Sequence, residues 1–217
     1  MSTEGVTTTT ATIVEVAPSL PAEEVLRQTI EVLARGGVVA FPTDTLYGIG
    51  CALGQPEALA RIQNMRGFDG AKRPLTFLLP DVGELAHYAT VSESAFRIIN
   101  RIFPGPYCAE LLANSRVPAP FVHEERRTIG VRIPDTALCE RLLWGLAKPM
   151  LTATAKSRSG HVLTSAGEIQ AEYGPDLDLI LDGGTLAGPP STVVSLVDDW
   201  VTVLREGRGP ASKIMMG

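Results

Sequence analysis

Hydrophobic residues recur along the chain at two spacings, one typical of helices and the other of strands. Apolar positions three or four residues apart, closed by glycine or proline, predict helices at 21–37, 55–67, 81–89, 92–105, 136–147 and 165–174. Apolar and β-branched runs predict strands at 38–41, 73–79, 107–113, 128–134, 149–155, 177–184, 191–197 and 200–207. This interleaving predicts an α/β fold around a twisted open sheet, and the consecutive strands near the C-terminus indicate a mixed sheet.

The same pattern favours one domain with short flanking segments. A length of 217 residues fits a single large domain, and no linker or internal repeat interrupts the alternation. We place the domain at residues 21–210 and a C-terminal tail at residues 211–217. Residues 1–20 form either an N-terminal tail or, through residues 11–18, an added edge strand.

The composition is that of a soluble globular protein, with 45% hydrophobic and 20% charged residues and a net charge of −5. This balance argues against strong non-specific affinity for nucleic acid but not against a docked RNA.

Cys51, Cys108 and Cys139 form no C-x-x-C pair, which predicts buried free thiols in a reducing compartment and no metal site. No apolar run approaches the roughly 18 residues of a membrane span, and the N-terminus lacks the pattern of a secretory signal. We therefore expect a cytoplasmic protein with no membrane association.

The segment "VVAFPTDTLYGIGCALG", residues 38–54, places hydroxyl groups directly after a buried strand. Pro42 ends the strand, Thr43, Thr45 and Tyr47 follow it, and glycines then allow close backbone approach. One interpretation is a ligand-facing turn, and the other is an ordinary strand and turn that is rich in Thr because of its β propensity. The glycine spacing is one residue too wide for a dinucleotide-binding loop, so we do not expect a Rossmann site.

Cations collect in two other segments. The loop in "NMRGFDGAKRPLTFLL" carries Arg66, Lys72 and Arg73 beside glycines. That composition suits a phosphate chain, although a solvated surface loop is the alternative. Arg132 interrupts the apolar strand "TIGVRIP", where an unpaired guanidinium would be costly to bury, so it points to solvent or meets an anion.

Hydroxyls and a further cation mark two more strand ends. In "PMLTATAKSRSG" the residues Thr152, Thr154 and Lys156 occupy alternate positions and can face one side. Ser191 and Thr192 open the strand in "GPPSTVVSLVDD". No acid–base pair accompanies them, and the isolated histidines are interpreted as exposed residues: His87, His123 and His161. The set favours binding and aligning an anionic nucleotide with a small polar substrate over hydrolysis by a triad.

These segments, in order and together with "FPGPY", "ILDGG" and "VLREG", resemble the YrdC-like family of L-threonylcarbamoyladenylate synthases over roughly residues 22–210. The resemblance implies a twisted open sheet with a large, positively charged cavity. It also implies that L-threonine, bicarbonate and ATP, the last with Mg²⁺, are converted to threonylcarbamoyl-AMP and pyrophosphate. This is the first step towards threonylcarbamoyladenosine in tRNA. The implied partners are therefore tRNA or double-stranded RNA and a separate enzyme that completes the transfer.

The resemblance also implies roles for individual residues. The residues expected to bind substrate are Thr43, Thr45, Tyr47, Arg132, Thr152, Ser191 and Thr192. The residues expected to bind nucleotide are Lys72, Arg73, Thr128, Thr154 and Arg205. The residues expected to act in catalysis are Arg66, Thr154 and Lys156.

Two elements depart from the synthase pattern. Synthases carry K-x-R after the second helix and S-x-N on a later strand, whereas this chain reads Arg66-Gly67-Phe68 and Thr154-Ala155-Lys156. The chain is thereby closer to the YciO-like branch of the family. Two hypotheses follow: a threonylcarbamoyl-AMP synthase, or a nucleotide- or RNA-binding homologue that lacks synthase activity or acts on threonylcarbamoylated tRNA.

Overall fold

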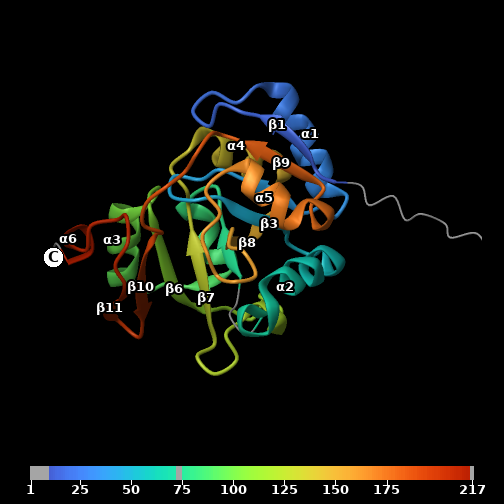
Figure 1. Ribbon diagram of the computed structural model, residues 1–217. Helices are drawn as coiled ribbons and strands as arrows, with labels where there is room; N and C mark the ends of the chain where they lie inside the picture. Colours follow the sequence, from blue (N-terminus) through green and yellow to red (C-terminus); the bar gives the residue numbers. More distant parts are fainter. Residues whose placement is uncertain (1–9, 72–74, 216–217) are drawn as a thin grey trace, which may run out of the picture.

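The computed structural model describes residues 10–71 and 75–215 and shows an α/β domain built on one mixed sheet (Figure 1). The helices are α1 Glu23–Ala34, α2 Pro56–Ala71, α3 Glu93–Ile102, α4 Ala137–Leu146, α5 Ala166–Tyr173 and α6 Ser212–Met215. The 3₁₀ turns are η1 Val82–His87, η2 Ala119–Phe121 and η3 Gly174–Asp176. The strands are β1 Thr12–Glu15, β2 Val39–Phe41, β3 Gly48–Ala52, β4 Thr76–Leu78, β5 Ala89–Thr90, β6 Tyr107–Ala113, β7 Thr128–Arg132, β8 Met150–Thr154, β9 Leu179–Asp182, β10 Thr192–Val197 and β11 Trp200–Arg205.

The sheet is mixed, as the sequence predicts. Its strand order is β1-β9-β2-β3-β8-β4-β7-β6-β10-β11, and β5 pairs with β6 beside this path. β9 runs parallel to β1 and β2, β4 parallel to β7, and β6 parallel to β10, whereas the other pairs are antiparallel. The segment left open between tail and strand contains β1, which lies at one end of the sheet beside β9.

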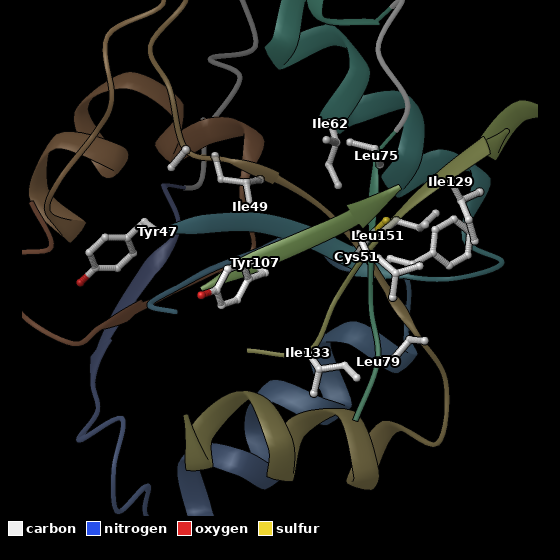
Figure 2. Packing of buried hydrophobic residues seen from close by; sticks show 14 of the residues in the cluster. Tyr47, Ile49, Cys51, Ile62, Leu75, Leu79, Tyr107, Ile129, Ile133 and Leu151 are labelled. Atoms are coloured by element: carbon white, nitrogen blue, oxygen red, sulfur yellow. The ribbon is translucent and has the colours of Figure 1, made fainter. Parts of the chain in front are cut away.

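Helices cover both faces of the sheet, because neighbouring residues of a strand point to opposite faces. In β2, Val39 and Phe41 join one apolar cluster, in which α1 and α4 pack, and Ala40 joins the other. The second and larger cluster receives side chains from α2, α3 and α5 and includes Tyr47 and Tyr107, both labelled in Figure 2. Packing against these helices on both faces fixes the position of the sheet, and with it the strand ends that carry the polar residues.

One local prediction was wrong. Residues 81–89 form the 3₁₀ turn η1 followed by β5 instead of a helix, and Asp81 caps the turn by accepting from the Gly83 N–H at 2.7 Å. Of the two interpretations of residues 38–54, an ordinary strand describes residues 48–52, which form the buried strand β3 between β2 and β8. A Cβ on Gly50 would lie 2.5 Å from Cγ2 of Thr152, so this glycine accommodates a neighbouring strand and not a ligand.

Candidate functional site

The strand ends surround a cavity of about 790 Å³. Most residues predicted for the site line it: Thr43, Thr45, Tyr47, Arg66, Thr128, Arg132, Thr152, Thr154, Lys156, Ser191 and Arg205. These residues come from segments far apart in the chain, and the sheet brings them together. Lys72 and Arg73, predicted to bind nucleotide, lie outside the described residues.

Three hydroxyl groups form a chain on one wall of the cavity. Thr43 and Thr45 are buried in the turn after β2, where Thr43 Oγ1 donates to the Leu46 carbonyl at 2.7 Å and accepts from the Thr45 N–H at 3.1 Å. Thr45 Oγ1 lies 3.2 Å from Thr43 Oγ1 and 3.4 Å from Ser191 Oγ. These contacts fix the positions of the hydroxyls, so they can receive a small polar ligand with little rearrangement.

Tyr47 contributes its ring to this wall, but its hydroxyl has partners within the protein. The hydroxyl donates to the Gly184 carbonyl at 2.7 Å and accepts from the Gly183 N–H at 3.0 Å. Burial raises the pKa of the phenol, an effect that the Gly183 N–H opposes. Tyr47 thus fastens the loop after β9 to the turn after β2, and direct contact between its hydroxyl and a substrate stays a prediction.

Arg132 meets an anion, and the anion is a carboxylate of the same chain. Its Nη2 lies 2.6 Å from Oδ1 of Asp44, and the side chains are only 13% and 9% exposed. Asp44 Oδ2 and Arg132 Nε are buried without a hydrogen-bond partner among the described residues. The pair is therefore fixed by one strong contact and keeps one donor and one acceptor for water or a ligand.

The end of β8 presents alternating side chains to the cavity, as its sequence predicts. Thr152, Thr154 and Lys156 all line the cavity; Thr152 is buried and the other two are exposed. Arg66 approaches from α2, which is kinked immediately afterwards because Gly67 has a φ of 66° and a ψ of −177°. The two elements that depart from the synthase pattern thus end on the same cavity.

Thr192, predicted to bind substrate, is not among the residues that line the cavity. The cavity is lined by Ser191 and Val193, whereas the intervening Thr192 points away, because successive strand residues alternate. Its hydroxyl donates to the Gly209 carbonyl and accepts from the Gly207 N–H. Thr192 therefore anchors the segment after β11.

Several lining residues were not predicted from the sequence to belong to the site: Thr76, Cys108, Glu110, His123, Arg126, Ser157, Arg158 and Ser159. Arg126 forms an ion pair with Glu110 at 3.1 Å. His123 was interpreted as exposed but is half-buried in the cavity wall. Ser157 and Ser159 continue the hydroxyl-rich run after β8, and this composition was the one available signal for them.

Burial raises the pKa of the Cys108 thiol although Arg132 opposes the effect, so Cys108 is held as a thiol and does not suit a nucleophile.

Positive charge dominates the cavity. Its described lining includes six cationic side chains, Arg66, Arg126, Arg132, Lys156, Arg158 and Arg205, and one carboxylate, that of Glu110. Three of these cations form ion pairs within the chain: Arg126 with Glu110, Arg132 with Asp44, and Arg158 with Glu172 and Asp176. Cations still outnumber the carboxylates of the lining and of these pairs. Such an excess attracts an anionic ligand such as a nucleotide phosphate chain.

The described residues contain no cluster of three or more His, Cys, Asp or Glu that could hold a metal ion. Within residues 10–71 and 75–215, no helix has the length and hydrophobicity to cross a membrane.

A mixed α/β sheet with hydroxyls and cations gathered on one cavity defines a site suited to a polar, anionic ligand. The sequence also identifies a family. The family model described as Telomere recombination, which covers Sua5, YciO and YrdC, matches residues 31–207. The chain belongs to this family.

Relatives from both branches of the family match most of the chain. It is 34% identical over 194 residues to an uncharacterized Escherichia coli protein, YciO, covering 88% of this chain and 93% of the relative. The crystal structure of E. coli YciO superposes with a TM-score of 0.88 at 31% identity, covering 94% and 100% of the two chains. A putative threonylcarbamoyl-AMP synthase of Methanocaldococcus jannaschii is 29% identical, covering 88% and 92%. The structure of P. abyssi Sua5 complexed with L-threonine gives a TM-score of 0.83 at 27% identity, covering 94% of this chain and 60% of Sua5.

Proposed function

We propose that this protein forms threonylcarbamoyl-AMP from L-threonine, bicarbonate and ATP. The observation that carries the proposal is the shared cavity, in which the hydroxyls of Thr43, Thr45 and Ser191 face the same space as the cations. The hydroxyl wall suits a small amino acid with its own hydroxyl, and the cations suit a triphosphate. Homologues named threonylcarbamoyl-AMP synthases, at about 30% identity, support an enzyme of this class.

The proposed reaction has two steps. The threonine amine first combines with bicarbonate to give the carbamate and water. A carbamate oxygen then attacks the α-phosphorus of ATP, the bond to the β-phosphate bridge oxygen breaks, and pyrophosphate leaves. Charge spreads over the phosphoryl oxygens during this displacement, so cations fixed in advance stabilise it. Arg66, Lys156 and Arg205 are the groups we assign to the nucleotide, which enters with Mg²⁺ as part of the substrate.

The direct test incubates the purified full chain with radiolabelled threonine, bicarbonate and Mg·ATP. Synthase activity predicts a labelled adenylate and pyrophosphate in equal amounts, both dependent on bicarbonate. Omitting bicarbonate is the matched control, because it removes the carbamate while leaving threonine and ATP binding intact. The absence of a bicarbonate-dependent adenylate would refute the proposal.

A second candidate is hydrolysis of the threonylcarbamoyl group of modified tRNA, in which water attacks the carbonyl carbon, the bond to the adenine N6 breaks, and the adenine amine leaves with a proton while threonine carbamate is released. Two observations favour it: Gly67 kinks α2 where the synthase pattern carries its cationic element, and the cavity wall offers Glu110 and His123 as proton acceptors. The same cavity would then receive the modified nucleoside of an RNA. Mass spectrometry of nucleosides from modified tRNA, before and after incubation with the protein, distinguishes the two reactions, since loss of threonylcarbamoyladenosine without ATP is expected only here.

We expect that Lys156→Asn, which restores the pattern of the synthase strand, does not by itself raise the activity that forms threonylcarbamoyl-AMP. The reason is that Arg66-Gly67-Phe68 still lacks the second cation of the first element, while the substitution removes a cation from the cavity. The measurement is labelled threonylcarbamoyl-AMP formed by the parent, by Lys156→Asn and by Lys156→Asn with Phe68→Arg. If the single variant outperforms the parent, Lys156 does not compensate for the altered element.

A further inference from the structure

The hydroxyl of Tyr173 contacts two segments that carry cations of the cavity. Tyr173 ends α5, its side chain is buried, and it belongs to the cavity lining. Its hydroxyl donates to the Lys156 carbonyl at 2.8 Å and lies 3.1 Å from the Met65 carbonyl oxygen. Lys156 follows β8, and the Met65 carbonyl belongs to the peptide unit that joins Met65 to Arg66 on α2. One buried hydroxyl therefore contacts the main chain at both cationic residues.

The hydroxyl supplies a hydrogen-bond donor where α2 kinks. In a regular α-helix each carbonyl accepts from the N–H four residues later. For Met65 this stretch includes Gly67, whose φ of 66° and ψ of −177° are not helical. A break of this kind leaves helical carbonyls in need of another donor, and a buried carbonyl without a donor is costly. The Tyr173 hydroxyl thereby stabilises the kinked backbone that places Arg66.

A single proton serves both acceptors. A phenol donates one hydrogen bond, whereas a carbonyl oxygen only accepts. Both carbonyls must therefore stay within reach of the one Tyr173 oxygen, and a shift of either segment by about 1 Å would exceed hydrogen-bond distance. The contact thus sets the distance between the main chain of Lys156 and that of Met65.

The ring of Tyr173 is held by Arg158. The central guanidinium carbon of Arg158 lies 4.9 Å from the ring centroid, and the guanidinium forms ion pairs with Glu172 at 3.7 Å and Asp176 at 3.2 Å. The Arg158 side chain is 59% exposed, so these contacts are individually weak. They orient the ring, whereas the buried hydroxyl carries the link between the two segments.

We propose that Tyr173 is a positioning residue of the cavity, and that its hydroxyl sets the separation of Arg66 and Lys156 so that both bind one phosphate chain. Both cations lie in the elements that depart from the synthase pattern, and Tyr173 joins these elements through their main chains. A polyphosphate binds more tightly when its cations are fixed before it arrives, because less ordering is required on binding. This role rests on the proposed assignment of the two cations to the nucleotide, and its test requires binding alone.

Calorimetry on the full chain with ATP and with inorganic tripolyphosphate tests the proposal. Tyr173→Phe keeps the ring and removes the hydroxyl, so we expect the affinity for both probes to fall by about 3- to 10-fold, the equivalent of one neutral hydrogen bond. Tyr107→Phe is the matched control. Tyr107 is also buried, its hydroxyl donates to the Pro210 carbonyl at 3.2 Å, and it is not among the described residues that line the cavity. This variant should bind both probes as the parent does.

A double-mutant cycle with Lys156→Ala distinguishes positioning from a general loss of stability. If Tyr173 acts through Lys156, then Tyr173→Phe should weaken ATP binding less in the Lys156→Ala background than in the parent. A merely structural hydroxyl would lower the affinity by the same factor in both backgrounds, and that outcome overturns the proposal. The proposal is also overturned if Tyr173→Phe binds both probes as the parent does, or if the parent binds neither.

Amide hydrogen exchange reports the order of the turn after β8 without a ligand. In Tyr173→Phe, residues 156–163 should exchange faster than in the parent and in Tyr107→Phe, because the Lys156 carbonyl has lost its donor. Unchanged exchange in this stretch overturns the proposal. Binding of both probes without any bicarbonate-dependent adenylate would refute the proposed reaction and leave the role of Tyr173 intact. Thermal unfolding of each variant verifies that it folds.

Discussion

Arg132→Ala is expected to weaken ligand binding and to destabilise the fold together. The lost guanidinium removes a charged hydrogen bond worth about 1.5–3 kcal/mol, so ligand affinity should fall by about 10- to 150-fold. Truncation also leaves the carboxylate of Asp44 buried without its cation, which in other proteins costs about 3–5 kcal/mol. We expect urea unfolding to report the second loss, and calorimetry with ATP and with threonine to report the first.

A double-mutant cycle separates these two effects. Asp44→Ala alone should also be destabilising, because it leaves Arg132 buried without an anion. Arg132→Ala with Asp44→Ala removes both charges, so it should recover stability relative to either single variant but should not recover ligand affinity. If the double variant binds ligand as the parent does, Arg132 acts only in folding. If Arg132→Ala leaves the unfolding free energy unchanged, the ion pair contributes nothing to stability.

Much of the fold could be predicted because its elements carry periodic signals. The apolar residues of α1 recur at helical spacing, and the run of β2 is continuous, as is typical of a strand buried on both faces. β3 could not be predicted in this way, because its two glycines read as a turn. The requirement at Gly50 comes from Thr152 on β8, a neighbour about a hundred positions away in the sequence, and at Gly48 a Cβ would lie 3.3 Å from the ring of Phe41 on β2.

The site was partly predictable because strand alternation is local. It placed Thr152, Thr154 and Lys156 on one side, and the cavity receives all three. The same rule should have separated Ser191 from Thr192, which were grouped on hydroxyl chemistry alone.

Contacts between side chains far apart in the sequence could not be predicted from the sequence. The partner of Arg132 lies 88 positions away, in a turn where Asp44 stands among hydroxyl residues. His123 and Arg126 belong to the connection between β6 and β7, which has no periodicity to indicate where its side chains lie. Such contacts depend on how the connections fold back, and only the assembled sheet determines that.

The segment after β11 shows how backbone packing supports the cavity. Arg205 donates through Nη2 to the Ser191 carbonyl at 2.9 Å, so the end of β11 and the start of β10 hold each other. Gly207 follows β11 and packs against the backbone of Pro190 and Ser191, and its N–H donates to Thr192 Oγ1 at 2.9 Å. The "VLREG" motif therefore serves the site through a glycine that approaches backbone closely.

Gly207→Ala is accordingly expected to disrupt both the segment and the cavity. A Cβ there would lie 2.1 Å from the Pro190 carbonyl oxygen and 2.7 Å from the Ser191 carbonyl carbon, and backbone atoms cannot yield as a flexible side chain can. We expect a loss of about 3 kcal/mol or more in urea unfolding, at the upper end of overpacking costs. Affinity for ATP and threonine should also fall, since Ser191 and Arg205 must shift. Gly167→Ala in α5, where a Cβ meets nothing within 4 Å, makes the same chemical change and should be neutral or slightly stabilising. If the two variants unfold alike, the close approach at Gly207 is relieved at little cost, and the support that we assign to this segment is wrong.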